Sequence, residues 1–184
     1  MENQLNNDIE TIIRDTITTV GMEIDVVQKK TGVNMMYDFI EHCVLVDSER
    51  LHIARGEMDH MLPISDYVQA LTLHELGHAL DRKALLESLP GTRDVIELKR
   101  TFSRQELYRN SHLLKKIIDE NNQDYQFEET AWTNAERLNN MFHIVSTHCL
   151  IQMKEHGLAT YKQTFLQDNA VYEGLVAAEL AIQR

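Results

Sequence analysis

The chain has 184 residues, and its 29 Asp and Glu residues against 18 Lys and Arg residues give a net charge of −11. A domain of ordinary size accounts for this length, so we expect a single domain over residues 1–184. Its 43% hydrophobic and 26% charged residues are close to globular averages and exclude a wholly disordered chain. Seven Gly and two Pro residues are few for this length, which argues against a turn-rich β-sandwich and favours long helices.

The charge and the cysteine usage restrict the partners and the compartment. Nucleic acid is not an expected partner of an acidic chain, because phosphate binding needs a cationic surface. No apolar stretch approaches the ~18 residues needed to cross a bilayer, and the N-terminal residues lack the basic and apolar regions of a secretion signal. Cys43 and Cys149 form no Cys-x-x-Cys pair, so we expect two buried thiols. The sequence predicts a cytoplasmic protein that binds neither nucleic acid nor a membrane.

The N-terminal third predicts one helix and two strands. Apolar residues at helical spacing indicate a helix from about Leu5 to Val20. The following stretch, which contains Gly21 and Gly32, shows no clear pattern. Two short runs rich in β-branched residues, Cys43–Val46 and Leu51–Ala54, predict two strands joined by a turn.

The rest of the chain predicts helices. One should begin near Ser65, whose hydroxyl can cap it, and run to about Ser88 or Leu89, where Pro90-Gly91 breaks it. Polar breaks at 121–124 and 156–157 separate the later helices, which we expect at Val95–Arg109, Leu113–Glu120, Gln126–Lys154, Ala159–Phe165 and Ala170–Gln183. The predicted fold is a mostly helical α+β domain, with a small antiparallel or mixed sheet packed on the Ser65 helix and a helical C-terminal half.

The Ser65 helix contains a metal-binding pattern, His74-Glu-Leu-Gly-His78, which matches H-E-x-x-H. At ~100° per residue the two histidines lie ~40° apart and one turn apart, so both imidazoles can reach one zinc ion. Glu75 projects ~100° to the side, where its carboxylate can accept a proton from water instead of binding the metal. Two hydrogen-bonded histidines on an amphipathic helix are the alternative interpretation.

The surroundings of the pattern predict a buried helix. Leu73, Leu76 and Leu80 share a face away from the histidines, and other leucines flank the histidine stripe. A glycine inside a helix costs up to about 1 kcal/mol relative to alanine, so Gly77 indicates that another backbone packs closely there.

A catalytic zinc site needs a third protein ligand, with a fourth position left for water. A metzincin continuation would place Gly at position 81 and His at position 84, where this chain has Asp81 and Ala84. A later helix instead offers the pattern Glu128-Glu-Thr-Ala131. When the residues of this helix are projected down its axis, Glu128 lies among apolar residues and Glu129 lies on the polar face. A carboxylate among apolar groups is costly without a partner, so we favour Glu128 over Glu129 as the third ligand.

These residues resemble the gluzincin metallopeptidases, particularly the compact bacterial and phage-encoded kind. The segment His74–Asp81 is also similar to the active-site helix of the anthrax lethal-factor-like group. The resemblance covers about Cys43 to Phe142. It departs from the pattern at Trp132, where an acidic residue often follows the alanine, and in the spacing of about 50 residues between His78 and Glu128.

The resemblance implies further features of the site. An edge strand ahead of the active-site helix should pair with extended peptide substrate, and Leu51–Ala54 is placed to be that strand; an ordinary hairpin strand is the alternative. Asp81 either orients a ligating imidazole, caps a neighbouring group, or forms a surface ion pair with Arg82 or Lys83. A donor that stabilises an oxyanion is also expected, and its candidates are Tyr125, Tyr161, Tyr172, His143 and His148.

The predicted function is that of a zinc-dependent peptidase, an endopeptidase that acts on a peptide or protein substrate. His74, His78 and Glu128 would hold one zinc ion per chain, and Glu75 would act as the general base. The first alternative is a zinc-binding regulatory or interaction module on the same scaffold without turnover. The second is a structural helical module that holds no metal.

Overall fold

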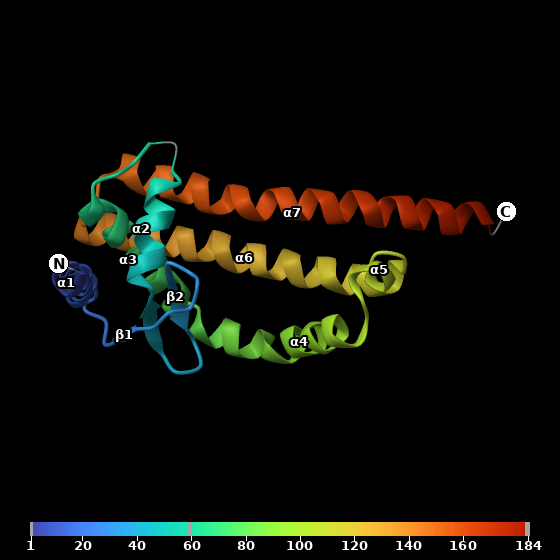
Figure 1. The fold of residues 1–184 in the computed structure, drawn as a ribbon, viewed down its shortest axis with the longest axis horizontal. Coiled ribbons are helices and arrows are strands. Elements are labelled where there is room, and N and C mark those ends of the chain that lie inside the picture. The colour runs from blue at the N-terminus through green and yellow to red at the C-terminus, as the bar shows by residue number, and fades with distance from the viewer. Residues whose placement is uncertain (1, 59, 183–184) are drawn as a thin grey trace.

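The computed structural model describes residues 2–58 and 60–182, which form seven helices and one small sheet (Figure 1). The elements follow the chain as α1 (Glu2–Val20), β1 (Asp25–Gln28), β2 (Met35–Asp38), β3 (Cys43–Val46), α2 (Ser48–Gly56), α3 (Ile64–Leu80), α4 (Arg82–Thr101), α5 (Arg104–Leu107), α6 (Ser111–Phe142) and α7 (Thr147–Ile182). This arrangement confirms the predicted fold class, a mostly helical α+β fold with a small mixed sheet packed on the helix that carries the histidines.

The sheet has the order β1-β3-β2, with β3 in the centre. Val44 of β3 pairs with Val26 of the parallel strand β1 and with Tyr37 of the antiparallel strand β2. All four residues of β3 are buried, which is why its apolar run was visible in the sequence. The outer strands have short and mixed patterns, and they fill the stretch for which the sequence predicted nothing.

The second predicted strand, Leu51–Ala54, is wrong, because these residues belong to helix α2. Asp47 caps this helix by accepting a hydrogen bond from the backbone N–H of Arg50 at 3.1 Å. Its second carboxylate oxygen accepts from the backbone N–H groups of Thr31 and Gly32. An Asp cap outweighs the β-branched composition of the four residues that follow.

The histidine helix is shorter than predicted. Its start is not capped by Ser65, whose hydroxyl instead donates to the side chain of Asp66, and it follows Pro63. The helix ends at Leu80 because the chain turns at Asp81, and Leu80 is therefore exposed instead of buried. Beyond this turn, the Arg82 guanidinium donates to backbone carbonyls between β2 and β3, a tertiary contact that no local pattern reveals.

The predicted breaks in the C-terminal half are also wrong. Helix α4 continues through Pro90, α6 through 121–124, and α7 through Gly157. Helices α6 and α7 are instead separated at 143–146, inside the predicted helix Gln126–Lys154, and His143 there has a positive φ of 53°. There the side chain of Asn139 accepts hydrogen bonds from the backbone N–H groups of Ile144 and Val145.

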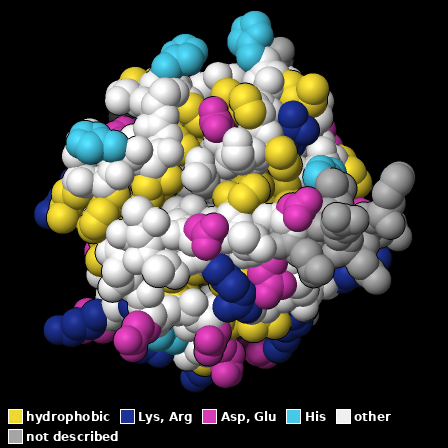
Figure 2. All heavy atoms as spheres, turned by 90° about the vertical axis from the view of Figure 1, so that its left-hand side faces the viewer, with side chains coloured by type: hydrophobic (Ala, Val, Ile, Leu, Met, Phe, Trp, Pro, Cys, Tyr) yellow, Lys and Arg dark blue, Asp and Glu magenta, His cyan; other side chains and the backbone are white. Residues whose placement is uncertain are grey.

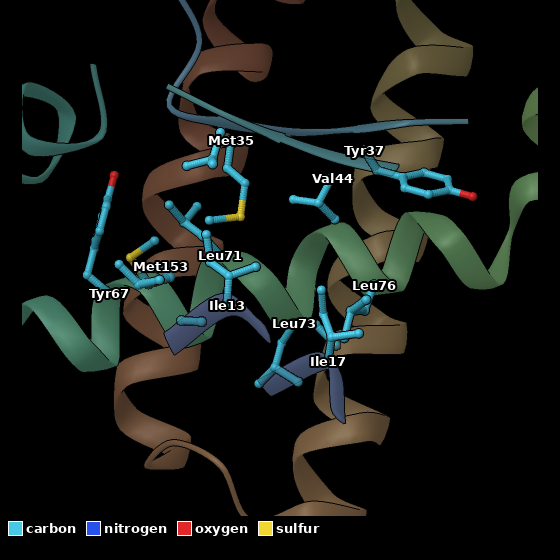
Figure 3. Close-up of a cluster of buried hydrophobic side chains, with 14 of the residues drawn as sticks. Ile13, Ile17, Met35, Tyr37, Val44, Tyr67, Leu71, Leu73, Leu76 and Met153 are labelled. Atoms are coloured by element: carbon cyan, nitrogen blue, oxygen red, sulfur yellow. The ribbon is translucent and has the colours of Figure 1, made fainter. Parts of the chain in front are cut away.

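The main core surrounds α3. Figure 3 shows this helix between the sheet, which supplies Tyr37 and Val44, and α1, which supplies Ile13 and Ile17. Helices α6 and α7 cross beside it. The helix is buried on several sides, as predicted, with every residue from Tyr67 to Gly77 buried except Gln69. Cys43 and Cys149 are buried free thiols, also as predicted.

The two ends of the molecule differ. Helices α4, α6 and α7 extend side by side away from the core, and a small apolar cluster of Val95, Leu107 and Ile117 joins α4, α5 and α6 there (Figure 1). At the opposite end, hydrophobic side chains and several histidines gather in the upper half of Figure 2, and charged side chains of both signs are mixed in the lower half. Among the described residues, no helix is long and apolar enough to cross a membrane.

The contact between α3 and α6 is closest at Gly77. A Cβ atom built on Gly77 would lie 2.1 Å from the backbone oxygen of Ala131, so only glycine allows the two helices to approach this far. Asn134, one turn after Ala131, donates its amide to the carbonyl of Gly77 at 3.1 Å. The close backbone predicted from Gly77 is therefore the backbone of α6.

Replacing Gly77 with Ala should destabilise the fold, because α3 and α6 would have to move apart. Overpacking of this kind typically costs about 1–3 kcal/mol. Gly91 is the matched control, since a Cβ there meets nothing within 4 Å and alanine favours the helix. Denaturant unfolding should show a clear loss for Gly77→Ala and no loss for Gly91→Ala. Equal stability of the two variants would contradict the close approach.

Candidate metal centre

The two histidines of the pattern point at the same carboxylate. His74 and His78 lie one turn apart on α3, with ring centroids 4.7 Å apart. Their Nε2 atoms lie 3.2 Å and 3.4 Å from the two carboxylate oxygens of Glu128, which α6 supplies. Glu129 is exposed. The structure thus brings together His74, His78 and Glu128, and leaves the alternative glutamate outside the group.

The spacing of these atoms fits a small metal ion. Ligands at ~2.0–2.1 Å from a tetrahedral zinc ion are separated by about 3.3 Å from one another. One ligand atom from each of the three residues lies within 4.8 Å of the other two, and no other group of three or more His, Cys, Asp or Glu among the described residues meets this condition. Two imidazoles and one carboxylate are also a donor set that catalytic zinc sites use. The group is a candidate metal-binding site.

The ionisation of Glu128 suits the binding of a cation. Burial alone would raise the pKa of the Glu128 carboxyl, but hydrogen bonds and charge from His74 and His78 outweigh it and hold that pKa well below its usual range. Burial alone would lower the pKa of His78, but the hydrogen bond to Glu128 and the nearby carboxylates raise it. Glu128 is therefore ionised, in the form that binds a cation.

Trp132 fixes the ring of His74. The two rings are stacked, with centroids 4.2 Å apart and planes at 28°. The Nδ1 atom of His74 is buried and has no hydrogen-bond partner among the described residues. A ligating histidine usually donates this N–H to an oxygen atom that orients the ring. Among the described residues, the ring of His74 is instead stacked on the indole of Trp132, one helical turn after Glu128.

Glu75 occupies a separate position beside the group. It is 5% exposed, and its Oε2 accepts a hydrogen bond of 2.8 Å from the backbone N–H of Tyr37 in β2. Burial raises the pKa of Glu75, and the charge of Glu128 adds to this rise, whereas the two histidines and the Tyr37 N–H oppose it. Glu75 is thus a buried carboxyl outside the three-residue group, with a pKa raised above its ordinary value.

Asp81 is hydrogen-bonded to Asn134 and forms no ion pair with Arg82 or Lys83. Its Oδ2 accepts a hydrogen bond of 3.1 Å from the amide of Asn134, the residue that also binds Gly77. Arg82 donates to backbone carbonyls instead, and Lys83 pairs with Glu87. Asp81 therefore helps to hold α6 against the end of α3, and its charge reaches His78 through space.

One of the five candidate oxyanion donors lies at the site. Burial raises the pKa of Tyr161, and the charge of Glu128 and a hydrogen bond to its carboxylate add to this rise. The exposed Glu129 instead raises the pKa of Tyr125. His148 and Tyr172 lie 13 and 11 residues along α7 from Tyr161, which is at least about 15 Å of helix, and His143 follows the end of α6, 15 residues after Glu128. The role of Tyr161 in catalysis stays a prediction.

Sequence reasoning missed three residues that shape the site: Tyr37, Trp132 as a ring partner, and Asn134. Tyr37 acts through its backbone N–H, which no side-chain pattern marks. Asn134 lies on the buried face of α6, one turn after Ala131. A polar residue on an apolar helix face was a visible sign of a buried hydrogen bond.

The chain has no recognisable relative in the comparisons with known proteins: no family model, no curated protein and no solved structure matches it. The assignment of the candidate metal site therefore depends on the geometry and the donor atoms of its residues alone.

Metal binding should depend on Glu128 and not on its neighbour. Glu128→Gln removes the charged ligand, so zinc affinity should fall by at least about tenfold, and His74→Ala should have a similar effect. Glu129→Gln is the matched control and should keep the affinity of the parent. Competition with a fluorescent zinc chelator measures all three. Equal losses in the two glutamine variants would contradict the assignment.

Proposed function

We propose that this protein is a zinc-dependent peptidase of the gluzincin type that cleaves peptide bonds within a peptide or protein substrate. The observation that carries the proposal is the convergence of His74, His78 and Glu128 with a separate buried carboxyl, Glu75, beside them. Three ligands and one adjacent base are the parts that a hydrolytic zinc site needs.

The proposed roles follow from the positions of the residues. His74, His78 and Glu128 would hold the ion, which supplies Lewis acidity and lowers the pKa of water. Glu75 accepts a proton from the attacking water and passes it to the leaving amine. Its raised pKa suits both steps, because a base is most effective when its pKa approaches the working pH. Tyr161 brings a hydroxyl donor to the same group.

The structure changes which strand is proposed to bind substrate. Leu51–Ala54 is helical, whereas the sheet order makes β2 an edge strand. The N–H of Tyr37 points away from β3 and donates to Glu75, so the outer edge of β2 borders the site. We propose that an extended peptide pairs with this edge through backbone hydrogen bonds.

Glu75 also bears on the alternative of zinc binding without turnover. A buried carboxyl outside the ligand group costs stability, because it loses its hydration. A module that only binds zinc has no use for such a group, whereas a peptidase needs it as a base. This difference supports the catalytic function and provides its test.

Replacing Glu75 with Gln should abolish hydrolysis and leave metal binding intact. The amide oxygen can still accept the Tyr37 N–H, but the amide cannot take a full proton. Proton transfer by a positioned group contributes about 10²–10⁴-fold, so the hydrolysis of a broad peptide mixture should fall by at least that factor. Zinc content and the thermal midpoint should stay close to those of the parent.

Glu129→Gln serves as the control for this assay and should keep full activity. Loss of zinc by the Glu75→Gln variant, or retention of its activity, would contradict the assignment of the base. A zinc-loaded parent protein that cleaves no peptide at all would instead favour the module without turnover.

A further inference from the structure

A cavity adjoins the candidate metal centre between α6 and α7. Its volume is about 300 Å³, and its lining residues are Asn121, Asp124, Thr160, Tyr161 and Phe165. Two of them connect it to the site, since Asp124 precedes Glu128 by one helical turn and the nearby charge of Glu128 helps to raise the pKa of Tyr161. This volume is at the lower end of the range for ligand pockets, about 300–1,000 Å³, and suits one side chain.

Asp124 is the acidic residue of the lining, and it is exposed. The Asn121 amide donates to Asp168 at 3.1 Å, and the Thr160 hydroxyl donates to the carbonyl of Gly157 at 2.8 Å. The carboxylate of Asp124 receives no hydrogen bond from any described group. The cavity therefore offers an acceptor and a negative charge to whatever enters it.

The charges around Asp124 favour a cation. Glu120, Asp124 and Glu128 follow one another at intervals of four residues, so their carboxylates lie along one stripe of α6. Desolvation raises the pKa of Asp124, and the charges of Glu120 and Glu128 raise it further; the exposed Lys99 of α4 opposes them and does not cancel the rise.

The walls suit the stem of a basic side chain. Phe165 and Tyr161 supply two aromatic rings from α7. Lys and Arg cover apolar surface with their methylene stems while their charged ends bind a carboxylate, and Arg also stacks on aromatic rings. Four residues of helix rise about 6 Å, so the step from Glu128 to Asp124 is comparable with the length of such a stem.

We infer that this cavity is the specificity pocket of the proposed peptidase and that it takes a Lys or Arg side chain of the substrate, with the cationic end on Asp124 and the stem against Phe165 and Tyr161. This inference rests on the proposed function, since it assigns a substrate preference to the same site.

A binding experiment tests the pocket without turnover. The zinc-loaded Glu75→Gln protein is titrated with four fluorescent peptides that are identical except for a central Lys, Arg, norleucine or Glu. The Lys and Arg peptides should bind about 2- to 5-fold more tightly than the norleucine peptide, as expected for an ion pair with an exposed carboxylate. The Glu peptide should bind most weakly.

Two variants in the same background assign this preference to Asp124. Asp124→Asn should remove the preference, and Asp124→Lys should shift it toward the Glu peptide. Asp119→Asn is the matched control, because Asp119 is an exposed residue of α6 paired with Lys115, and it should leave the preference unchanged. Zinc content is measured in each variant. Equal binding of the Lys and norleucine peptides by the Glu75→Gln protein overturns the inference, whether or not the further variants fold. A preference for the basic peptides that survives in a folded Asp124→Asn variant overturns it as well.

Cleavage of a peptide mixture by the active protein separates this inference from the proposed function. Cleavage beside Lys or Arg supports both, and cleavage without regard to basic residues overturns the pocket while the peptidase stands. Tight, Asp124-dependent binding of the basic peptides without any cleavage supports the pocket and contradicts the peptidase.

Discussion

The backbone contact between Gly77 and Ala131 is the constraint on which the rest of the site depends. It sets the distance between α3, which carries both histidines, and α6, which carries Glu128 three residues before the contact. Asn134 fixes the same crossing from the other side of the contact by donating to Gly77 and Asp81. Without this approach, the carboxylate of Glu128 could not lie within 3.2–3.4 Å of both imidazoles.

The crossing also concentrates charge that the fold must neutralise. Glu75 and Glu128 are two carboxyl groups beside two histidines in a region with little access to water. Isolated ionised groups in such a place are costly, and here the histidines offset part of the cost by hydrogen bonding to Glu128. One divalent cation between neutral imidazoles would balance two carboxylates, so the charges of the site are themselves suited to a metal ion such as zinc.

The sequence predicted the residues of the site more accurately than the bounds of the helices and strands. The spacing of His74 and His78 is a local property of one helix, and projection of a second helix placed Glu128 inward and Glu129 outward, as the structure has them. The partners of Glu75 and Asp81 come from distant segments, β2 and α6, so no spacing along the chain revealed them.

The errors in the fold have the same physical origin. Asp47 turns Leu51–Ala54 into a helix with help from the backbone of Thr31 and Gly32. Gly157 does not break α7, because the indole of Trp132 packs against it at 3.4 Å from where a Cβ would be. Helix ends and helix continuity in this chain are set by tertiary contacts, which outweigh the local preferences of glycine and proline.

The central claim is that His74, His78 and Glu128 form the ligand set of one metal ion, and X-ray absorption spectroscopy of the zinc-loaded protein tests it most directly. The account predicts a first shell of nitrogen and oxygen atoms at about 2.0–2.1 Å, with the outer-shell scattering of two imidazoles. It also predicts that Glu128→Gln changes the oxygen contribution and keeps both imidazoles. Sulfur at about 2.3 Å, which only Cys43, Cys149 or a methionine could supply, or fewer than two imidazoles, would contradict the assignment.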